Sequence, residues 1–257
     1  MNIQLPYLPE RSGKPRQKGV VMVMDKGLSV RQAEDFISVA GNDLADFVKL
    51  GFGTSVISND VKTKIKLYKK ANIKVYVGGT LFEAFIIRNM FDDYRRFLDD
   101  FGLDAVEVSD GSMQMKHEDK CMYISKLAKT HTVLSEVGSK SAGIIIQPNK
   151  WVEMMTNELN AGSKFVIGEA RESGTVGIYR PSGKAHVELI HKILKKVDIN
   201  KIIWEAPQKS QQIWFIKQFG ANVNLGNIAP ADLIPLETLR LGLRGDTFFD
   251  FLPDELK

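Results

Sequence analysis

The chain has 257 residues, 44% hydrophobic and 26% charged, a balance that is ordinary for a globular protein able to bury a large core. Its formal net charge of +4 comes mostly from residues 1–18, so the charge pattern excludes a nucleic-acid-binding surface. The single cysteine, Cys121, excludes an internal disulfide bond and a cysteine metal cage, and it suits a reducing compartment.

Residues 1–18 are rich in proline and basic side chains and lack the apolar core of a secretory signal. No apolar run in the sequence reaches the roughly 18–20 residues that cross a bilayer. We therefore expect a cytoplasmic protein with no membrane partner. Residues 1–18 are expected to be an extended arm that only leads into a single domain, 19–257. The alternative is that the arm crosses a partner subunit or covers the bottom of that domain.

Apolar, strand-like runs alternate with helix-like runs along the rest of the chain. We expect strands at 19–24, 45–50, 73–78, 104–109, 132–137, 164–169, 201–206 and 222–227. Eight strands alternating with helices over about 250 residues are typical of an α/β TIM (β/α)8 barrel. A doubly wound sheet is the alternative, but the first strand is followed by "MDKGLS", which is not its glycine fingerprint.

Two of the connecting segments have clear helical signals. Val61, Ile65 and Tyr68 recur at helical spacing, and the lysines between them are expected on solvated faces. A second helix is expected to start near Ser210 and to end at Gly220.

Four glutamates stand at the ends of apolar runs. Side chains alternate between the two faces of a strand, and the outward face of a barrel strand must be apolar to pack on helices. The same alternation places Lys49, Arg171 and Asn224 inward. The glutamates are therefore expected to point into the barrel near the carboxyl ends of the fourth to seventh strands: Glu107, Glu136, Glu169 and Glu205.

Clustered carboxylates repel one another and lose hydration, so they need compensation. Neighbouring cations are one source, and a self-contained network of ion pairs inside the barrel is therefore one interpretation. A divalent metal is the other source. Because oxygen ligands without histidine or cysteine favour a hard ion, we expect Mg²⁺.

The loops that follow the strands carry glycine, lysine and arginine, which suit an anionic, phosphate-bearing ligand. These loops contribute Lys26, Gly79, Ser109, Asp110, Lys140, Gln208, Lys209 and Arg244.

Several stretches, in order from about residue 19 to residue 248, resemble the phosphosulfolactate synthase family. They include "MDKGL" (24–28), "DFVKLGFGTS" (46–55), "EVGSK" (136–140), "WEAPQKSQQ" (204–212) and "LETLRLGLRGDTF" (236–248). The resemblance implies a TIM barrel that adds sulfite to phosphoenolpyruvate in a Mg²⁺-dependent reaction. The product would be (2R)-2-O-phospho-3-sulfolactate, an intermediate of coenzyme M biosynthesis. Assembly into a homo-oligomer is a further expectation.

The resembled reaction needs a metal ion, a cationic surround and an acid that protonates C2. The expected metal ligands are Glu136, Glu169, Glu205 and Asp110. The expected substrate-binding residues are Arg171, Lys209, Gln208, Arg244, Asn224, Gly79 and Ser109. The expected catalytic residues are Lys140 as first candidate for the acid, Lys49 as second, and Lys26 in the cationic surround. A lysine crowded by cations would have a lowered pKa that suits an acid.

Segments 140–150 and 174–183 differ from the archaeal pattern of the family. Two other functions therefore stay open. One is an enzyme that adds another nucleophile to an enolpyruvate or runs a lyase reaction. The other is a non-catalytic, stress-related member of the family.

Overall fold

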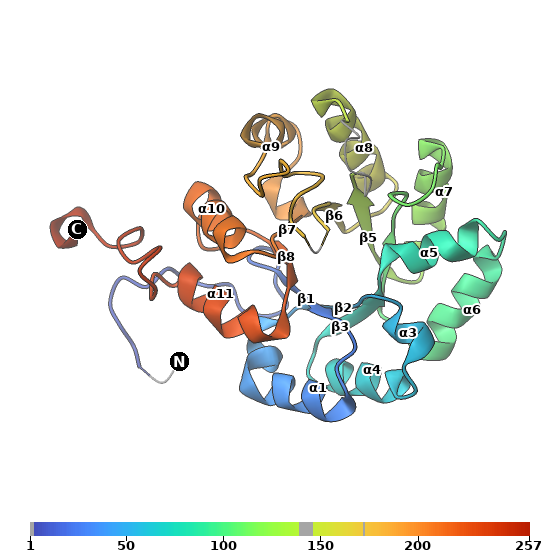
Figure 1. The fold of residues 1–257 in the computed structure, drawn as a ribbon, viewed down its shortest axis with the longest axis horizontal. Coiled ribbons are helices and arrows are strands. Elements are labelled where there is room, and N and C mark those ends of the chain that lie inside the picture. The colour runs from blue at the N-terminus through green and yellow to red at the C-terminus, as the bar shows by residue number, and fades with distance from the viewer. Residues whose placement is uncertain (1–2, 139–145, 172) are drawn as a thin grey trace.

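The computed structural model describes residues 3–138, 146–171 and 173–257. Eight parallel strands form one sheet in the order β3-β2-β1-β8-β7-β6-β5-β4, and the end strands β3 and β4 lie side by side. The sheet therefore curls into a nearly closed barrel (Figure 1). The strands are β1 (Val21–Asp25), β2 (Phe47–Leu50), β3 (Lys74–Val77), β4 (Ala105–Val108), β5 (Thr132–Val137), β6 (Phe165–Gly168), β7 (Ile202–Glu205) and β8 (Leu225–Ile228).

The helices surround the strands (Figure 1). They are α1 (Val30–Phe36), α2 (Asn42–Leu44), α3 (Thr54–Ile57), α4 (Val61–Lys70), α5 (Gly79–Ile86), α6 (Phe91–Phe101), α7 (His117–Leu127), α8 (Pro148–Asn160), α9 (Val187–Leu194), α10 (Lys209–Phe219) and α11 (Leu233–Arg240). Within the described residues there are also four short turns of other helical types: η1 (Ile37–Gly41), η2 (Ile199–Lys201), η3 (Pro230–Asp232) and η4 (Asp254–Leu256). No helix in the described ranges is long and apolar enough to span a membrane.

The predicted TIM barrel is confirmed, and each of the eight strands lies where it was expected. The largest difference is at β8, which was expected from residue 222 and begins at Leu225. The two predicted helices are also present as α4 and α10, and α10 ends at Phe219, where Gly220 caps it with a positive φ of 84°. Alternation of apolar and polar residues was enough to locate these elements.

Alternation also divides the strand side chains into two apolar groups. One faces outward and packs on the helices, and the other fills the barrel interior. Phe47, Tyr76 and Phe165 form the aromatic part of the interior, with ring centroids 6.2 Å apart for Phe47–Tyr76 and 6.1 Å for Phe47–Phe165. On β2 the same inward face becomes polar two residues further along, where Phe47 is followed by Lys49.

The lysines of α4 correct one expectation. Lys64 is fully buried rather than solvated, because its Nζ lies 2.8 Å from Oδ2 of Asp25 at the end of β1. The hydroxyl of Tyr68 donates to the same carboxylate oxygen at 3.0 Å. The other oxygen of Asp25 accepts the backbone N–H groups of Gly27 and Leu28, so this aspartate builds the loop after β1.

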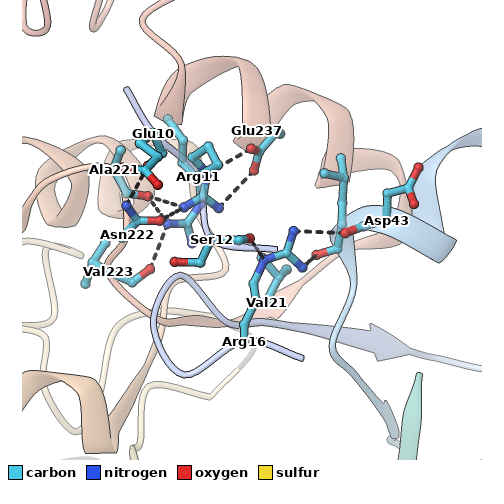
Figure 2. A network of polar contacts seen from close by, with 12 residues as sticks. Glu10, Arg11, Ser12, Arg16, Val21, Asp43, Ala221, Asn222, Val223 and Glu237 are labelled. Atoms are coloured by element: carbon cyan, nitrogen blue, oxygen red, sulfur yellow. Dashed lines mark hydrogen bonds and ion pairs between the residues drawn. The ribbon is translucent and has the colours of Figure 1, made fainter. Parts of the chain in front are cut away.

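The N-terminal arm lies against the bottom of the barrel, at the ends where the strands begin (Figure 2). Arg11 pairs with Glu237 of α11, with 2.8 Å between Nε and Oε1, and donates to the carbonyl of Ala221 at 2.9 Å. Arg16 donates to the carbonyl of Asp43 at 2.9 Å, and Lys14 to that of Ala45 at 2.7 Å. These contacts tie the arm to the barrel, as the alternative of an arm that covers the bottom requires, and the division of the chain at residue 18 stays a prediction.

Candidate active site

A pocket of about 490 Å³ opens at the carboxyl ends of the strands. Its polar walls carry Lys49, Glu107, Glu136, Glu169, Arg171, Glu205 and Asn227. Two loops that contain glycine, residues 51–53 and 78–79, line another part of the pocket. The inward glutamates predicted from alternation therefore all reach the same space.

Lys49 is the cation at the centre of this group. Its Nζ lies 2.9 Å from Oε2 of Glu107, 3.6 Å from Oε2 of Glu136 and 3.6 Å from Oε1 of Glu205. Burial acts to lower the pKa of Lys49, but the three carboxylates outweigh it and raise the pKa well above its ordinary value. The expectation that cations crowd Lys49 and lower its pKa is therefore wrong.

Backbone amides hold two of the carboxylates. Oε2 of Glu205 accepts the N–H of Ala170 at 2.9 Å, and Oε1 of Glu169 accepts the N–H of Arg171 at 2.6 Å. Burial raises the pKa of Glu205 to about 7, against the lowering effect of Lys49. The tight loop after β6 thus orients carboxylates from two neighbouring strands.

Three of the four predicted metal ligands come together. Glu136, Glu169 and Glu205 are buried, and each offers a carboxylate oxygen within 4.8 Å of the other two. Asp110 does not join them, because its Oδ1 lies 2.8 Å from Nζ of Lys120 on α7. Asp110 therefore lies outside this group of three, and its role as a metal ligand stays a prediction.

Lys120 also supports the site from behind β5. It is buried, donates to the backbone carbonyl of Glu136 at 2.7 Å and pairs with Glu158 of α8 at 2.9 Å. Burial acts to lower the pKa of Lys120, but Glu158 and Asp110 raise it above its ordinary value. A charged Lys120 therefore ties the end of β5 to α7 and α8.

Gly79 connects the pocket floor to α5. Its backbone N–H donates to Oε1 of Glu107 at 2.6 Å. A Cβ at this position would lie 2.8 Å from the same oxygen and 2.3 Å from Oγ of Ser109. Only glycine fits there. Gly79 lines the pocket, and its substrate-binding role stays a prediction.

Glu83 was missed by the sequence reasoning. This buried residue of α5 accepts the hydroxyl of Ser109 and, at 2.7 Å, the backbone N–H of Ser112. Ser109 thus uses its hydroxyl within the wall, and the serines that line the pocket are Ser55 and Ser112. A glutamate between apolar residues in "LFEAF" (81–85) was the available signal.

The predicted cationic residues lie at different depths. Arg171 lines the pocket and has a positive φ of 54°. Lys26 lies on the rim, where its Nζ is 5.1 Å from the ring centroid of Phe52. Lys140 lies outside the described residues, so its place in the site stays a prediction.

Three predicted substrate-binding residues make contacts outside the lining of the pocket. Lys209 pairs with Asp246, with 2.7 Å between Nζ and Oδ2, and both side chains are exposed. Gln208 donates to the carbonyl of Ser173 at 2.7 Å, and Arg244 to that of Pro235 at 3.5 Å. Their substrate-binding roles stay predictions.

Asn224 is the clear error among the predicted substrate-binding residues. It precedes β8 and lies at the bottom of the barrel, where its Oδ1 accepts the N–H of Val20 at 2.9 Å. Its Nδ2 donates to the carbonyls of Asn200 and Ile202, both at 3.1 Å. The pocket is instead lined by Asn227, which sequence reasoning missed.

Comparison with known proteins identifies close relatives. The family model described as (2R)-phospho-3-sulfolactate synthase (ComA) matches residues 9–246. The phosphosulfolactate synthase of Methanocaldococcus jannaschii is 46% identical over 245 residues, which cover 90% of this chain and 94% of the relative. That of Bacillus subtilis is 42% identical over 245 residues, which cover 94% of this chain and 97% of the relative.

Solved structures with low sequence identity share the fold. A 3-keto-L-gulonate-6-phosphate decarboxylase from Vibrio cholerae has a TM-score of 0.54 and 13% identity, and the match covers 92% of this chain and 100% of that one. A 3-hexulose-6-phosphate synthase has a TM-score of 0.52 and 17% identity, covering 86% of this chain and 99% of that one. These likenesses support the barrel architecture alone.

Proposed function

The chain belongs to the (2R)-phospho-3-sulfolactate synthase family, and we propose that it adds sulfite to phosphoenolpyruvate to give (2R)-2-O-phospho-3-sulfolactate. The observation that carries the proposal is the group of glutamates around Lys49 at the floor of the barrel pocket. Such a floor offers oxygen ligands and a fixed positive charge within one small space, and an anionic enolate-forming reaction needs both.

For the cofactor we propose Mg²⁺ held by Glu136, Glu169 and Glu205. The support is that these buried residues offer three carboxylate oxygens within 4.8 Å of one another, a donor set that hard divalent cations prefer. A bound cation would stabilise the negative charge that builds on the substrate carboxylate.

The carbon–sulfur bond forms when the lone pair on the sulfur of sulfite attacks C3 of phosphoenolpyruvate. The π electrons of the C2–C3 double bond move toward the carboxylate, and a proton then adds to C2, so no oxidant or reductant is needed. Lys49 suits the stabilisation of this charge, because the carboxylates around it raise its pKa and keep it protonated.

For the acid that protonates C2, Lys140 stays the first candidate. It follows β5 by three residues in the sequence, and the inward Glu136 of that strand lines the pocket. Lys49 is the second candidate, but a raised pKa makes its ammonium a weaker acid.

For the phosphate and the sulfite we propose Arg171 and the two glycine-containing loops. Arg171 lines the pocket, and residues 51–53 and 78–79 bring the backbone to its wall. Lys26, Lys209, Gln208 and Arg244 would act from the rim as a cationic and polar surround.

The direct test is to incubate the protein with phosphoenolpyruvate, sulfite and Mg²⁺ and to follow the loss of enol absorbance. Phosphorus NMR should then identify a phosphosulfolactate. Binding of phosphoenolpyruvate without sulfite-dependent turnover would favour another nucleophile. Neither binding nor turnover would favour a non-catalytic family member.

The assignment of the acid has its own test. Lys140→Ala should abolish product formation while the circular dichroism spectrum stays that of the wild type. Lys150→Ala is a matched control, since Lys150 is exposed and pairs only with Glu153 of the same helix among the described contacts. Full activity in Lys140→Ala would remove the assignment.

A further inference from the structure

Strand β8 contains an extra residue relative to its neighbour β1. Val21 of β1 pairs with Leu225 of β8, and Val23 pairs with Ile228, so two steps on one strand match three steps on the other. This is a β-bulge, which locally interrupts the alternation of side chains. Bulges often re-aim a side chain next to an active site.

The bulge turns two consecutive residues toward the interior. Leu225 and Ile228 both belong to the outward core that packs on the helices, although strict alternation would place them on opposite faces. Gly226 faces inward, because a Cβ there would lie 2.7 Å from Met22 and 3.0 Å from Ile203 of the interior core. Asn227 also faces inward, since it lines the pocket.

Asn227 is held in this position by its backbone. Its φ is +55°, a left-handed conformation that asparagine tolerates better than most residues. Its backbone N–H lies 3.4 Å from Sδ of Met22. The side chain is buried, and its Oδ1 has no hydrogen-bond partner among the described residues.

An unpartnered buried amide oxygen lowers stability, because its lost hydration is not replaced by a hydrogen bond within the protein. A ligand in the pocket would supply the partner. A half-turn about the Cβ–Cγ bond exchanges the amide oxygen and nitrogen, so the same buried position can offer N–H groups to an anion.

We infer that Asn227 is a substrate-binding residue whose side-chain amide donates a hydrogen bond to an anionic oxygen of the ligand. The bulge aims the amide into the pocket beside Glu205, whose strand partner is Gly226. Beside these carboxylates an amide adds a donor without adding negative charge. The identity of the ligand as phosphoenolpyruvate rests on the proposed function, whereas the orientation of Asn227 does not.

The test compares three variants with the wild type. Asn227→Gly removes the amide and accepts the positive φ, and Asn227→Asp replaces the donor with a carboxylate. Asn89→Gly is the matched control, because Asn89 also has a φ of 55° but is exposed at the end of α5. The dissociation constant for phosphoenolpyruvate is measured by calorimetry without sulfite, and KM and kcat are measured with sulfite.

Asn227→Gly is expected to weaken phosphoenolpyruvate binding about tenfold or more and to raise KM more than it lowers kcat. Asn227→Asp should weaken binding further, because the new carboxylate repels the anion. Asn89→Gly should bind like the wild type, and the glycine variants should both keep the wild-type melting temperature within a few degrees.

Wild-type affinity for phosphoenolpyruvate in Asn227→Gly would overturn the inference. So would a loss of Mn²⁺ binding in that variant with phosphoenolpyruvate binding unchanged, since the amide would then serve the cation. A wild-type protein that binds phosphoenolpyruvate but does not use sulfite would overturn the proposed reaction instead. In that case the role of Asn227 is still decided by the dissociation constant for phosphoenolpyruvate in Asn227→Gly relative to that in the wild type.

Discussion

The ammonium of Lys49 lies 2.9 Å from one oxygen of Glu107, and the other oxygen of Glu107 accepts the N–H of Gly79 at 2.6 Å. One buried carboxylate therefore connects β2, β4 and the first turn of α5. This connection places a fixed positive charge at the centre of a group of glutamates, and the stability of the pocket floor depends on it.

Replacing Lys49 with methionine removes that charge and should lower the free energy of unfolding by about 3 kcal/mol, as expected for a broken buried ion pair. Lys49 lowers the pKa of Glu205 in the wild-type protein, so without the ammonium the folded-state pKa of Glu205 rises further. A raised folded-state pKa gives stability that is present at low pH and lost as pH rises, so the deficit should shrink toward about pH 5. Urea denaturation at acidic and mildly alkaline pH measures this difference.

A second substitution makes the experiment sharper. Glu107→Gln keeps an acceptor for Gly79 and removes one negative charge. In the Lys49→Met background it should restore part of the lost stability. An equal or larger loss in the double variant would show that the charge of Lys49 does not stabilise the floor.

The three-glutamate group predicts which carboxylates bind a cation. Glu169→Gln should weaken Mn²⁺ binding about tenfold or more, since it removes one anionic oxygen ligand. Asp110→Asn is the contrasting variant, because Asp110 pairs with Lys120 and lies outside the group. Electron paramagnetic resonance of free Mn²⁺ gives both affinities. Equal losses in the two variants would contradict the assignment.

Lys64 and Asp25 form a buried ion pair that should matter for stability alone. Lys64→Met leaves the Asp25 carboxylate without its cation and should cost about 3–5 kcal/mol of unfolding free energy. Lys66→Met on the same helix is the control, because Lys66 is exposed and its loss should change stability by less than about 0.5 kcal/mol. Chemical denaturation compares the two, and similar effects would be evidence against the buried pair.

Sequence reasoning located the strands and the inward glutamates because both depend on alternation within a single strand. It failed where contacts between elements decide the outcome. Lys64 looks like its solvated neighbours until Asp25 is known to lie beneath it. Asn224 was misplaced because β8 begins only after it, at Leu225, so its side chain lies at the bottom of the barrel. Asn227 was missed because a bulge against β1 shifts the alternation, and nothing within β8 reports that pairing.

The arm at the bottom of the barrel predicts a stability effect far from the pocket. Arg11→Ala removes the ion pair with Glu237 and the hydrogen bond to Ala221, and it should lower the melting temperature and expose the arm to trypsin. Lys18→Ala is the control, since Lys18 is exposed and belongs to the same arm. Equal protease sensitivity of the two variants would contradict a structural role for Arg11.

Cys121 predicts a pH-dependent reactivity. Burial and the charge of Glu158 raise the pKa of its thiol, and Sγ lies 3.6 Å from Nε2 of His117. The thiolate is the reactive form, so alkylation by iodoacetamide should be slower in the folded protein at mildly alkaline pH than in urea. The rate in the folded protein should keep rising at pH values where the unfolded chain has reached its plateau. Coincident pH profiles would argue against the raised pKa.

The aromatic layer of Phe47, Tyr76 and Phe165 determines how substrate enters the pocket and how product leaves it. These buried rings close the barrel beneath Lys49. The pocket is therefore closed at its floor and opens at the carboxyl ends of the strands. A product formed inside must leave through the same opening by which the substrate enters. Product and substrate therefore share one opening and one pocket. The product of the proposed reaction should be a competitive inhibitor with respect to phosphoenolpyruvate.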